Sequence, residues 1–301
     1  MTKRLAVFAS YDKNGIVHDS VVTYLKKLRA VADAVVFVAD NAADGEQRAK
    51  LDGLADIAVF APHGEYDFGS YKRGIKLARE NGMLDGCDEL ILCNDSCFAV
   101  GDMTAAFADM EREACDFWGL SENLDVERHL QSFFLVFKRA VFTSEPFGRF
   151  FDAVKREPDV LSVIRKYEIP LRKFFESGGF KDAALIKGAA DGNPIMYPLR
   201  MLDQRSFLIK RKVFCEPFYS MDSVGKLCRT LERSRPDAAR DIREYFGVRS
   251  LRPLCRRLFW QKAAVALRRF LCQKKRTKNG KIIIKICKVP VFYRRKNDSV
   301  S

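Results

Sequence analysis

The first hundred residues alternate between short apolar runs and segments whose apolar residues recur at helical spacing. The runs typical of strands cover residues 4–10, 34–39, 57–61 and 89–93. Helical spacing occupies residues 17–28, after the first run, and residues 68–81, after the third. Because each return to a parallel strand needs a covering segment, this alternation predicts a mostly parallel sheet flanked by helices, an α/β fold of the Rossmann type.

Polar residues follow each of the four expected strands. They are Ser10, Tyr11 and Asp12, then Asp40 and Asn41, then residues 63–67, then Asn94, Asp95 and Ser96. Ligands of such sheets bind at the carboxyl ends of the strands, so we expect these clusters to converge. The first cluster lacks any GxGxxG or GxxxxGK[ST] pattern, which argues against dehydrogenases and P-loop kinases.

The carboxylate of Asp95 directly follows the buried run at residues 89–93. In this position it could hold Mg²⁺ or Mn²⁺ together with substrate phosphates, because such cations bind one or two carboxylates plus phosphate oxygens. The alternative is that Asp95 only caps the next turn, as Asp and Asn side chains commonly do.

Four short motifs stand in order along the middle of the chain. They are YDFGS at 66–70, NDS at 94–96, DFWG at 116–119 and HLQSF at 129–133. In this order they resemble the rhamnan synthesis protein F family, glycosyltransferases of bacterial surface polysaccharide synthesis, over about residues 4–215. The resemblance implies a GT-A-like fold and a nucleotide-sugar donor, with rhamnose as a candidate sugar.

By the same resemblance, the loops at the strand ends bind the donor. The implied donor-binding residues are Ser10, Tyr11, Asp12, Asp40, Tyr66, Asp67, Asn94, Asp95, Ser96, His129 and Gln131. Asp95 stands in the place of the acidic metal motif of GT-A enzymes, with Mg²⁺ or Mn²⁺ as the implied ion. This chain offers one carboxylate there, whereas the common DxD pattern offers two. Asp67 could equally cap the helix that begins beside it.

An inverting glycosyltransferase needs a general base that takes the proton of the acceptor hydroxyl. Residues 167–180 look like the acidic and glycine-containing layout that carries this base in related GT-A enzymes, which makes Glu168 the first catalytic candidate. Asp116 is the second. The alternatives are that Glu168 is a solvated helix residue paired with Arg165 or Arg172, and that Asp116 is a turn residue.

Positive charge is concentrated at the C-terminus. Residues 251–301 hold 16 Lys and Arg and one acidic residue, whereas residues 1–250 are close to neutral. From Leu251 onward apolar residues recur at helical spacing among arginines, with Trp260 near the boundary. Such a basic amphipathic helix can bind an anionic membrane surface, and packing against the body is the alternative. We predict a catalytic domain over residues 1–250 and a basic tail over 251–301, with no nucleic acid as partner.

No apolar run reaches the ~20 residues that a membrane-spanning helix needs, and residues 1–9 contain no cleavage-like site. We therefore expect a cytoplasmic protein that is peripheral on the inner face of the cell membrane. The nine cysteines form no CxxC pair and several lie in apolar runs, so we expect reduced thiols.

The leading hypothesis is a glycosyltransferase that moves a sugar from a nucleotide-sugar donor to a lipid-linked or polysaccharide acceptor. The rival is a non-catalytic α/β binding protein that docks to the membrane or to a polysaccharide assembly complex through its basic tail. The single carboxylate of the NDS motif at residues 94–96 keeps this rival open.

Overall fold

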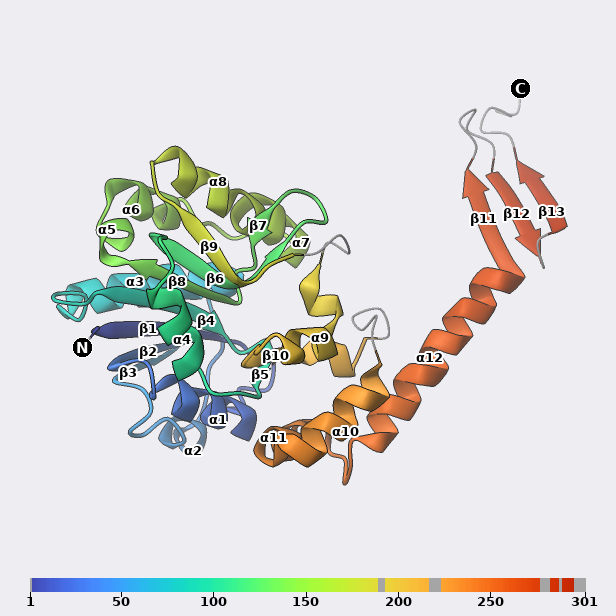
Figure 1. The fold of residues 1–301 in the computed structure, drawn as a ribbon, viewed down its shortest axis with the longest axis horizontal. Coiled ribbons are helices and arrows are strands. Elements are labelled where there is room, and N and C mark those ends of the chain that lie inside the picture. The colour runs from blue at the N-terminus through green and yellow to red at the C-terminus, as the bar shows by residue number, and fades with distance from the viewer. Residues whose placement is uncertain (1, 189–192, 217–222, 277–281, 287–288, 295–301) are drawn as a thin grey trace.

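The computed structural model describes residues 2–188, 193–216, 223–276, 282–286 and 289–294. Its centre is an eight-stranded sheet in the order β3-β2-β1-β4-β8-β6-β7, with β9 also paired to β6 (Figure 1). The strands are β1 (Arg4–Ser10), β2 (Ala34–Ala39), β3 (Ile57–Phe60), β4 (Glu89–Asn94), β6 (Phe117–Asn123), β7 (His129–Leu130), β8 (Phe134–Lys138) and β9 (Asp182–Ile186).

The four strands expected from the apolar runs form the parallel half of this sheet. Strands β3, β2, β1 and β4 lie side by side and run parallel, and their ends agree with the prediction to within one residue. Strand β8 runs antiparallel to both β4 and β6, and β9 runs parallel to β6. The predicted α/β class with a mostly parallel, helix-flanked sheet is confirmed.

Successive residues of β1 face opposite sides of the sheet, which creates two apolar layers. Ala6 and Phe8 face one layer, which α1 and α4 cover, whereas Leu5 and Val7 face the other, which α3, α6 and α8 cover. These helices are α1 (Asp19–Leu28), α3 (Tyr66–Glu80), α4 (Thr104–Glu111), α6 (Glu145–Asp152) and α8 (Ile169–Ser177). The short helices α2 (Gly45–Ala49) and α5 (Arg139–Phe142) complete the periphery.

Strand order reverses at β1, because β2 lies on one side of it and β4 on the other. Ligands of α/β sheets bind outside the carboxyl ends of the strands at such a point. Strand β10 (Leu208–Lys210) pairs with β5 (Cys97–Ala99) in a two-stranded antiparallel sheet. Because β5 directly follows β4, this pairing places β10, which is distant in the sequence, near the carboxyl end of β4. The backbone N–H of Arg211 then donates to the carbonyl of Ser96 at 2.9 Å, so the segment after β10 lies beside the end of β4.

The helical segment over residues 160–177 contains an irregular turn. It is built from α7 (Val160–Val163), a π-helical turn (Ile164–Glu168) and α8. Pro170 has no N–H to donate to the carbonyl four residues earlier, and its ring crowds that carbonyl, so the backbone widens there.

The start of the C-terminal helix packs against the body. Leu251, Leu254 and Leu258 share one apolar cluster with Leu227 and Ile242, as in the alternative that the sequence left open. Beyond these turns the helix leads away from the body to a small antiparallel sheet (Figure 1). The elements of this region are α9 (Pro198–Asp203), α10 (Val224–Ser234), α11 (Pro236–Phe246), α12 (Arg252–Leu271), β11 (Cys272–Arg276), β12 (Ile282–Ile286) and β13 (Val289–Arg294).

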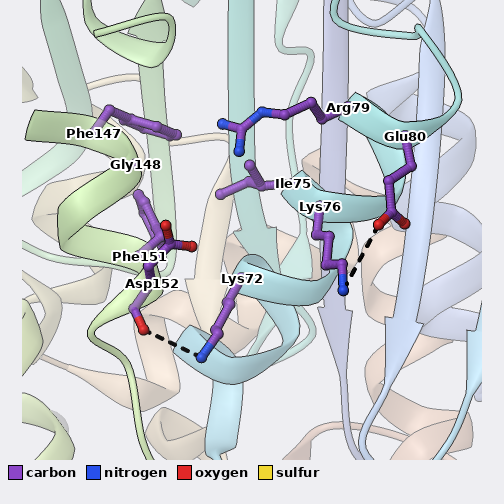
Figure 2. Close-up of a pocket in the computed structure, with 9 residues that line it drawn as sticks. All are labelled: Lys72, Ile75, Lys76, Arg79, Glu80, Phe147, Gly148, Phe151 and Asp152. Carbon is purple, nitrogen blue, oxygen red and sulfur yellow. Dashed lines mark hydrogen bonds and ion pairs between the residues drawn. The ribbon is translucent and has the colours of Figure 1, made fainter. Parts of the chain in front are cut away.

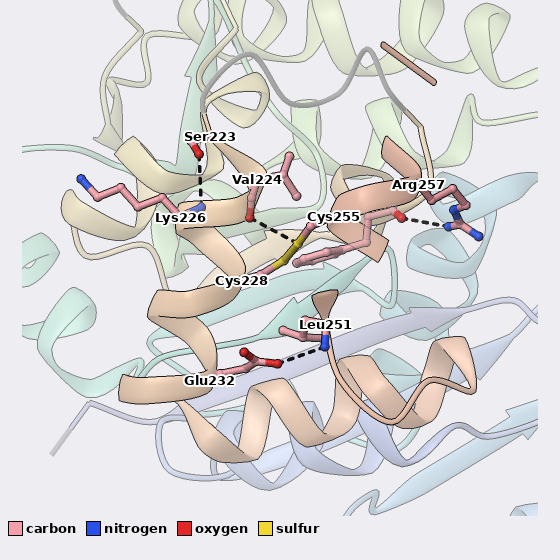
Figure 3. Close-up of a disulfide and its surroundings, with 9 residues drawn as sticks. Ser223, Val224, Lys226, Cys228, Glu232, Leu251, Cys255 and Arg257 are labelled. Atoms are coloured by element: carbon pink, nitrogen blue, oxygen red, sulfur yellow. Dashed lines mark hydrogen bonds between the residues drawn. A yellow bond between two sulfur atoms is a disulfide. The ribbon is translucent and has the colours of Figure 1, made fainter. Parts of the chain in front are cut away.

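The cysteines depart from the expectation of reduced thiols at one pair. Cys228 of α10 and Cys255 of α12 form a disulfide (Figure 3). The packing of α12 on α10 brings them together, and the backbone N–H of Leu251 donates to Glu232 at 3.0 Å in the same junction. Because the two residues are 27 positions apart, no local spacing pattern indicated this contact. The free thiols include Cys87, Cys93, Cys97 and Cys115, which are buried, and Cys215, which is exposed.

The substitution Gly74→Ala tests the close approach of α3 to the sheet. A Cβ at position 74 would lie 2.2 Å from Cγ1 of Val7, and β1 is held on both sides by β2 and β4. Because neither element can move away freely, we expect the free energy of unfolding to fall by about 1–3 kcal/mol. Urea denaturation followed by circular dichroism measures this change.

The matched control is Gly148→Ala in α6, where nothing lies within 4 Å of the added Cβ. This substitution should leave stability unchanged or raise it by about 0.5–1 kcal/mol, because alanine restricts the unfolded chain and favours helix. Equal destabilisation by the two substitutions would contradict the packing argument.

Candidate functional site

A pocket of about 350 Å³ opens beside the carboxyl end of β4. Six of the residues predicted for the site line it: Asp67, Asn94, Ser96, His129, Gln131 and Glu168. Polar residues that the sequence analysis did not select also line it: Asn123, Asp125, Ser132, Asn193, Lys210 and Lys212. Side chains from widely separated parts of the sequence therefore converge where the sheet topology places a ligand site.

A larger groove of about 530 Å³ lies between α3 and α6 (Figure 2). Two of its basic side chains have partners, since Lys72 Nζ donates to the backbone carbonyl of Asp152 at 3.3 Å and Lys76 pairs with Glu80 at 3.7 Å. None of the predicted site residues lines this groove. The smaller pocket, with its converging carboxylates and amides, is the better candidate site.

Asp67 is half-buried at the start of α3. Asn94 Nδ2 donates to its Oδ2 at 2.9 Å, and the backbone N–H of Phe68 donates to its Oδ1 at 3.0 Å. Loss of hydration, and then the negative charge of Glu168, raise the pKa of Asp67 to about 6. The preceding residue, Tyr66, has a left-handed backbone with φ of 58°, which is strained for a residue with a side chain. A perturbed carboxyl beside a strained residue is typical of functional sites.

Glu168 faces the pocket from the last position of the π-helical turn. Its Oε2 accepts hydrogen bonds from the backbone N–H of Ser132, at 2.8 Å, and from the Ser132 hydroxyl. Its Oε1 lies 3.9 Å from Nε2 of His129. The other ring nitrogen of His129 lies 2.8 Å from the carbonyl of Glu127 and therefore carries a proton, which directs Nε2 toward Glu168.

The alternative was that Glu168 is solvated and pairs with Arg165 or Arg172. The structure does not pair Arg172 with Glu168. Arg172 pairs with Asp182 at 3.0 Å and with Glu176 at 2.9 Å instead. The side chain of Glu168 is only 15% exposed. The carboxylate is thus directed inward, where it can contact a bound substrate.

Buried amides and hydroxyls form another part of the pocket wall. Gln131 Oε1 accepts from Ser121 Oγ at 2.8 Å, and Gln131 Nε2 donates to Asn193 Oδ1 at 3.4 Å. Asn123, at the end of β6, is also buried and lines the pocket. A few fixed polar groups of this kind are what orients a ligand in a binding pocket.

Two lysines bring positive charge to the pocket. Lys210, the last residue of β10, donates from Nζ to Ser96 Oγ at 2.7 Å, and its ammonium lies 4.3 Å from the ring centroid of Phe133. Lys212 lines the same pocket two residues later. In the sequence, the only indication that these lysines belong to the site was the basic run that follows the apolar residues 207–209.

Asp95 does not line the pocket, although its neighbours Asn94 and Ser96 do. Its Oδ2 accepts from Ser10 Oγ at 2.9 Å and from the backbone N–H of Tyr11 at 3.2 Å, and lies 3.9 Å from Arg211 Nη1. Within the described residues, no group of three or more His, Cys, Asp or Glu side chains is arranged to hold a metal ion. The residues around Asp95, which are donors and a cation, do not fit the Mg²⁺ or Mn²⁺ that the resemblance implies.

The remaining donor-binding candidates organise the loops at the same edge. Asp12 Oδ1 accepts from the backbone N–H groups of Asn14 and Ile16, and these donors lower the pKa of Asp12 although loss of hydration opposes them. Asp40 accepts from the backbone N–H groups of His63 and Gly64. The clusters at the strand ends therefore meet as predicted from the topology, but Ser10, Tyr11, Asp12, Asp40 and Tyr66 do not line the pocket.

Asp116 lies at the opposite edge of the sheet from the pocket. It precedes β6, and its carboxylate accepts from the backbone N–H of Lys181 at 2.8 Å. The next residue, Phe117, is in register with Phe137 of β8, which pairs with Leu90 near the start of β4. The structure thus does not bring this second catalytic candidate to the pocket, because β6 runs parallel to β4 and Asp116 stands at its amino end.

The family model described as rhamnan synthesis protein F matches residues 35–235, which include every residue named above as lining the pocket. The chain is also 25% identical over 186 residues to the uncharacterized protein y4gN of Sinorhizobium fredii. That match covers 60% of this chain and 48% of the relative, so the chain spans about half the length of the curated relative it matches.

Several solved structures match this chain at low sequence identity and with TM-scores below 0.5. The glycosyltransferase GlyE of Streptococcus pneumoniae TIGR4 has a TM-score of 0.44 and 12% identity over 87% of this chain and 64% of its own. A 4-diphosphocytidyl-2C-methyl-D-erythritol synthase has a TM-score of 0.41 and 14% identity over 68% and 97%. Core-mannan synthase A of Aspergillus fumigatus, in its Mn/GDP form, has a TM-score of 0.35 and 11% identity over 60% and 71%.

The electrostatic contact between Asp67 and Glu168 can be tested by titration. A ¹³C NMR titration of labelled carboxyl groups should give Asp67 a pKa of about 6. Glu168→Gln should lower that pKa, because it removes a neighbouring negative charge, whereas Asp116→Asn at the other edge should not change it. A pKa of Asp67 that is the same in all three proteins would show that the two carboxylates do not share a site.

The same shift predicts a pH dependence of stability. The pKa of Asp67 in the folded protein lies above its ordinary value of 3.8, so the folded chain binds more protons than the unfolded chain between about pH 4 and pH 6. The stabilising contribution of Asp67 should therefore be complete below about pH 4 and be lost as the pH rises through 6. Urea denaturation across this range should show a smaller fall in stability for Asp67→Asn than for the wild type.

Proposed function

The chain belongs to the rhamnan synthesis protein F family, and on this basis we propose that it is a glycosyltransferase that uses a nucleotide-sugar donor. The observation that carries the proposal is that two carboxylates, Asp67 and Glu168, face one pocket at the carboxyl edge of the sheet. Rhamnose is the first donor sugar to test, because the family description names rhamnan. The catalytic unit in this proposal is residues 1–250.

In this proposal the pocket holds the sugar and the phosphates of the donor. Asp67, Asn94, Ser96, His129 and Gln131 contact the donor directly from the pocket wall. Of the other donor-binding candidates, Ser10, Tyr11, Asp12, Asp40 and Asp95 fix the loops around it. Tyr66 stands beside Asp67 at the start of α3. An acceptor then approaches from the side of the π-helical turn, where Glu168 stands.

Glu168 is the proposed general base. Its Oε2 is fixed by two donors from Ser132, which orients the carboxylate. The carboxylate takes the proton of an acceptor hydroxyl while the hydroxyl oxygen bonds to the anomeric carbon of the donor sugar. The bond between that carbon and the donor phosphate oxygen breaks at the same time, and the nucleoside diphosphate leaves with the electron pair.

Replacing the base should separate chemistry from binding. We expect Glu168→Gln to lower kcat for sugar transfer by roughly 10²–10⁴-fold with little change in donor affinity, because glutamine keeps the shape of the side chain but takes no proton. Release of nucleoside diphosphate from a panel of nucleotide-sugars, starting with dTDP-rhamnose, measures the rate.

The matched control for this experiment is Glu176→Gln. Glu176 lies two turns later, in α8, where its side chain is 52% exposed and pairs with Arg172. This variant should retain the wild-type rate. Equal and negligible rates for the wild type and for Glu168→Gln with every donor would contradict the proposal and favour the non-catalytic binding protein.

We further propose that α12 brings the enzyme to an anionic membrane that holds a lipid-linked acceptor. Phe259 and Trp260 are each 64% exposed and Leu267 is 56% exposed, on a helix of the strongly basic C-terminal segment. Aromatic and basic side chains on one helix favour the interface of an anionic bilayer. Among the residues that the structure describes, no helix combines the length and the apolar character needed to cross a membrane.

A double variant, Phe259→Ser with Trp260→Ser, tests this proposal without disturbing the buried turns of α12. We expect binding to vesicles of phosphatidylcholine and phosphatidylglycerol to weaken at least about tenfold, since each aromatic ring contributes about 1.5–3 kcal/mol when buried. Leu161→Ser, which changes an equally exposed apolar residue of α7, is the control. Unchanged sedimentation of the double variant with these vesicles would disprove the membrane role of α12.

A further inference from the structure

Lys210 is held in a defined position at the pocket wall. Pairing of β10 with β5 places it opposite Cys97, directly after the NDS motif. Its ammonium donates to Ser96 Oγ at 2.7 Å and lies over the ring of Phe133. Because an ammonium has three donors, these contacts leave it able to bind a further acceptor in the pocket.

The side chains of the three consecutive basic residues after Ile209 lie in two different places. Lys210 and Lys212 line the pocket, whereas Arg211 turns toward Asp95 and stacks on the ring of Tyr245 at 4.6 Å. Both lysines therefore line the pocket from one short segment. The side chain of Lys212 is 51% exposed, and its Nζ lies 3.9 Å from Oε1 of Glu216.

Asp95, the residue implied for a metal ion, is directed elsewhere. Its carboxylate is surrounded by Ser10, Tyr11 and Arg211, which supply hydrogen atoms and positive charge. A divalent cation at that carboxylate would meet a guanidinium 3.9 Å away. The like charges would repel, so this carboxylate is better suited to fixing Arg211 than to holding a metal ion.

We propose that Lys210 and Lys212 bind the diphosphate of the donor, in place of a metal ion on Asp95. This inference rests on the proposed function. Lysine is a common ligand of phosphate groups, and a fixed ammonium stabilises the negative charge that develops on a diphosphate as the sugar leaves. The neighbouring Ser96 hydroxyl and the Asn94 amide supply uncharged contacts beside them.

The test is calorimetric binding of dTDP, UDP and GDP to the full chain, once in EDTA and once in MnCl₂. We expect at least one of them to bind in EDTA with an affinity within about threefold of that in MnCl₂. Lys210→Met should weaken this binding about tenfold or more, and Lys210→Arg should recover most of it. Lys26→Met, which changes an exposed lysine of α1 outside the pocket, is the control.

The possible failures can be told apart. Binding that requires MnCl₂, is lost in Asp95→Asn and is unaffected by the lysine substitutions would overturn this inference and leave the glycosyltransferase proposal standing. No binding of any nucleoside diphosphate or of dTDP-rhamnose, with or without metal, would overturn both. If Lys210→Met does not fold, Lys212→Met decides the question, because its partly exposed side chain can be replaced without opening the core.

Discussion

The carboxylate of Asp95 joins three segments that meet at the edge of the sheet. It accepts hydrogen bonds from Ser10 and Tyr11 after β1, and it faces the guanidinium of Arg211 after β10. Removing one partner of such a half-buried charged contact leaves the other uncompensated, so the arrangement is strongly preferred. Because Lys210 and Lys212 flank Arg211, this contact also determines which side chains reach the pocket.

The sequence predicted the parts of the fold that depend on local patterns. Each buried parallel strand needs a continuous apolar run, and β1 to β4 have one, so their positions were predicted to within a residue. Once four strands are parallel, the residues after them must share one edge. For this reason Asn94 and Ser96 were expected in the site, and they line the pocket together with Asp67, His129 and Glu168, which the motifs selected.

Features that depend on contacts between distant segments could not be predicted in this way. Lys210 and Asn193 reach the pocket through the pairing of β10 and the packing after β9, which no spacing rule encodes. The pairing of Cys228 with Cys255 follows from the packing of two helices. Asp116 shows a different limit, because an acidic residue beside an apolar run looks the same at either end of a strand.

The loop between β7 and β8 connects the two charged parts of the pocket. Ser132 holds the carboxylate of Glu168, and the ring of the next residue, Phe133, lies under the ammonium of Lys210. The pKa of Asp67 depends on both charged groups, because Glu168 raises it and Lys210 lowers it. An anion bound at Lys210 offsets that lowering and so increases the proton affinity of Asp67. A diphosphate in the pocket would thus convert Asp67 toward a neutral hydrogen-bond donor.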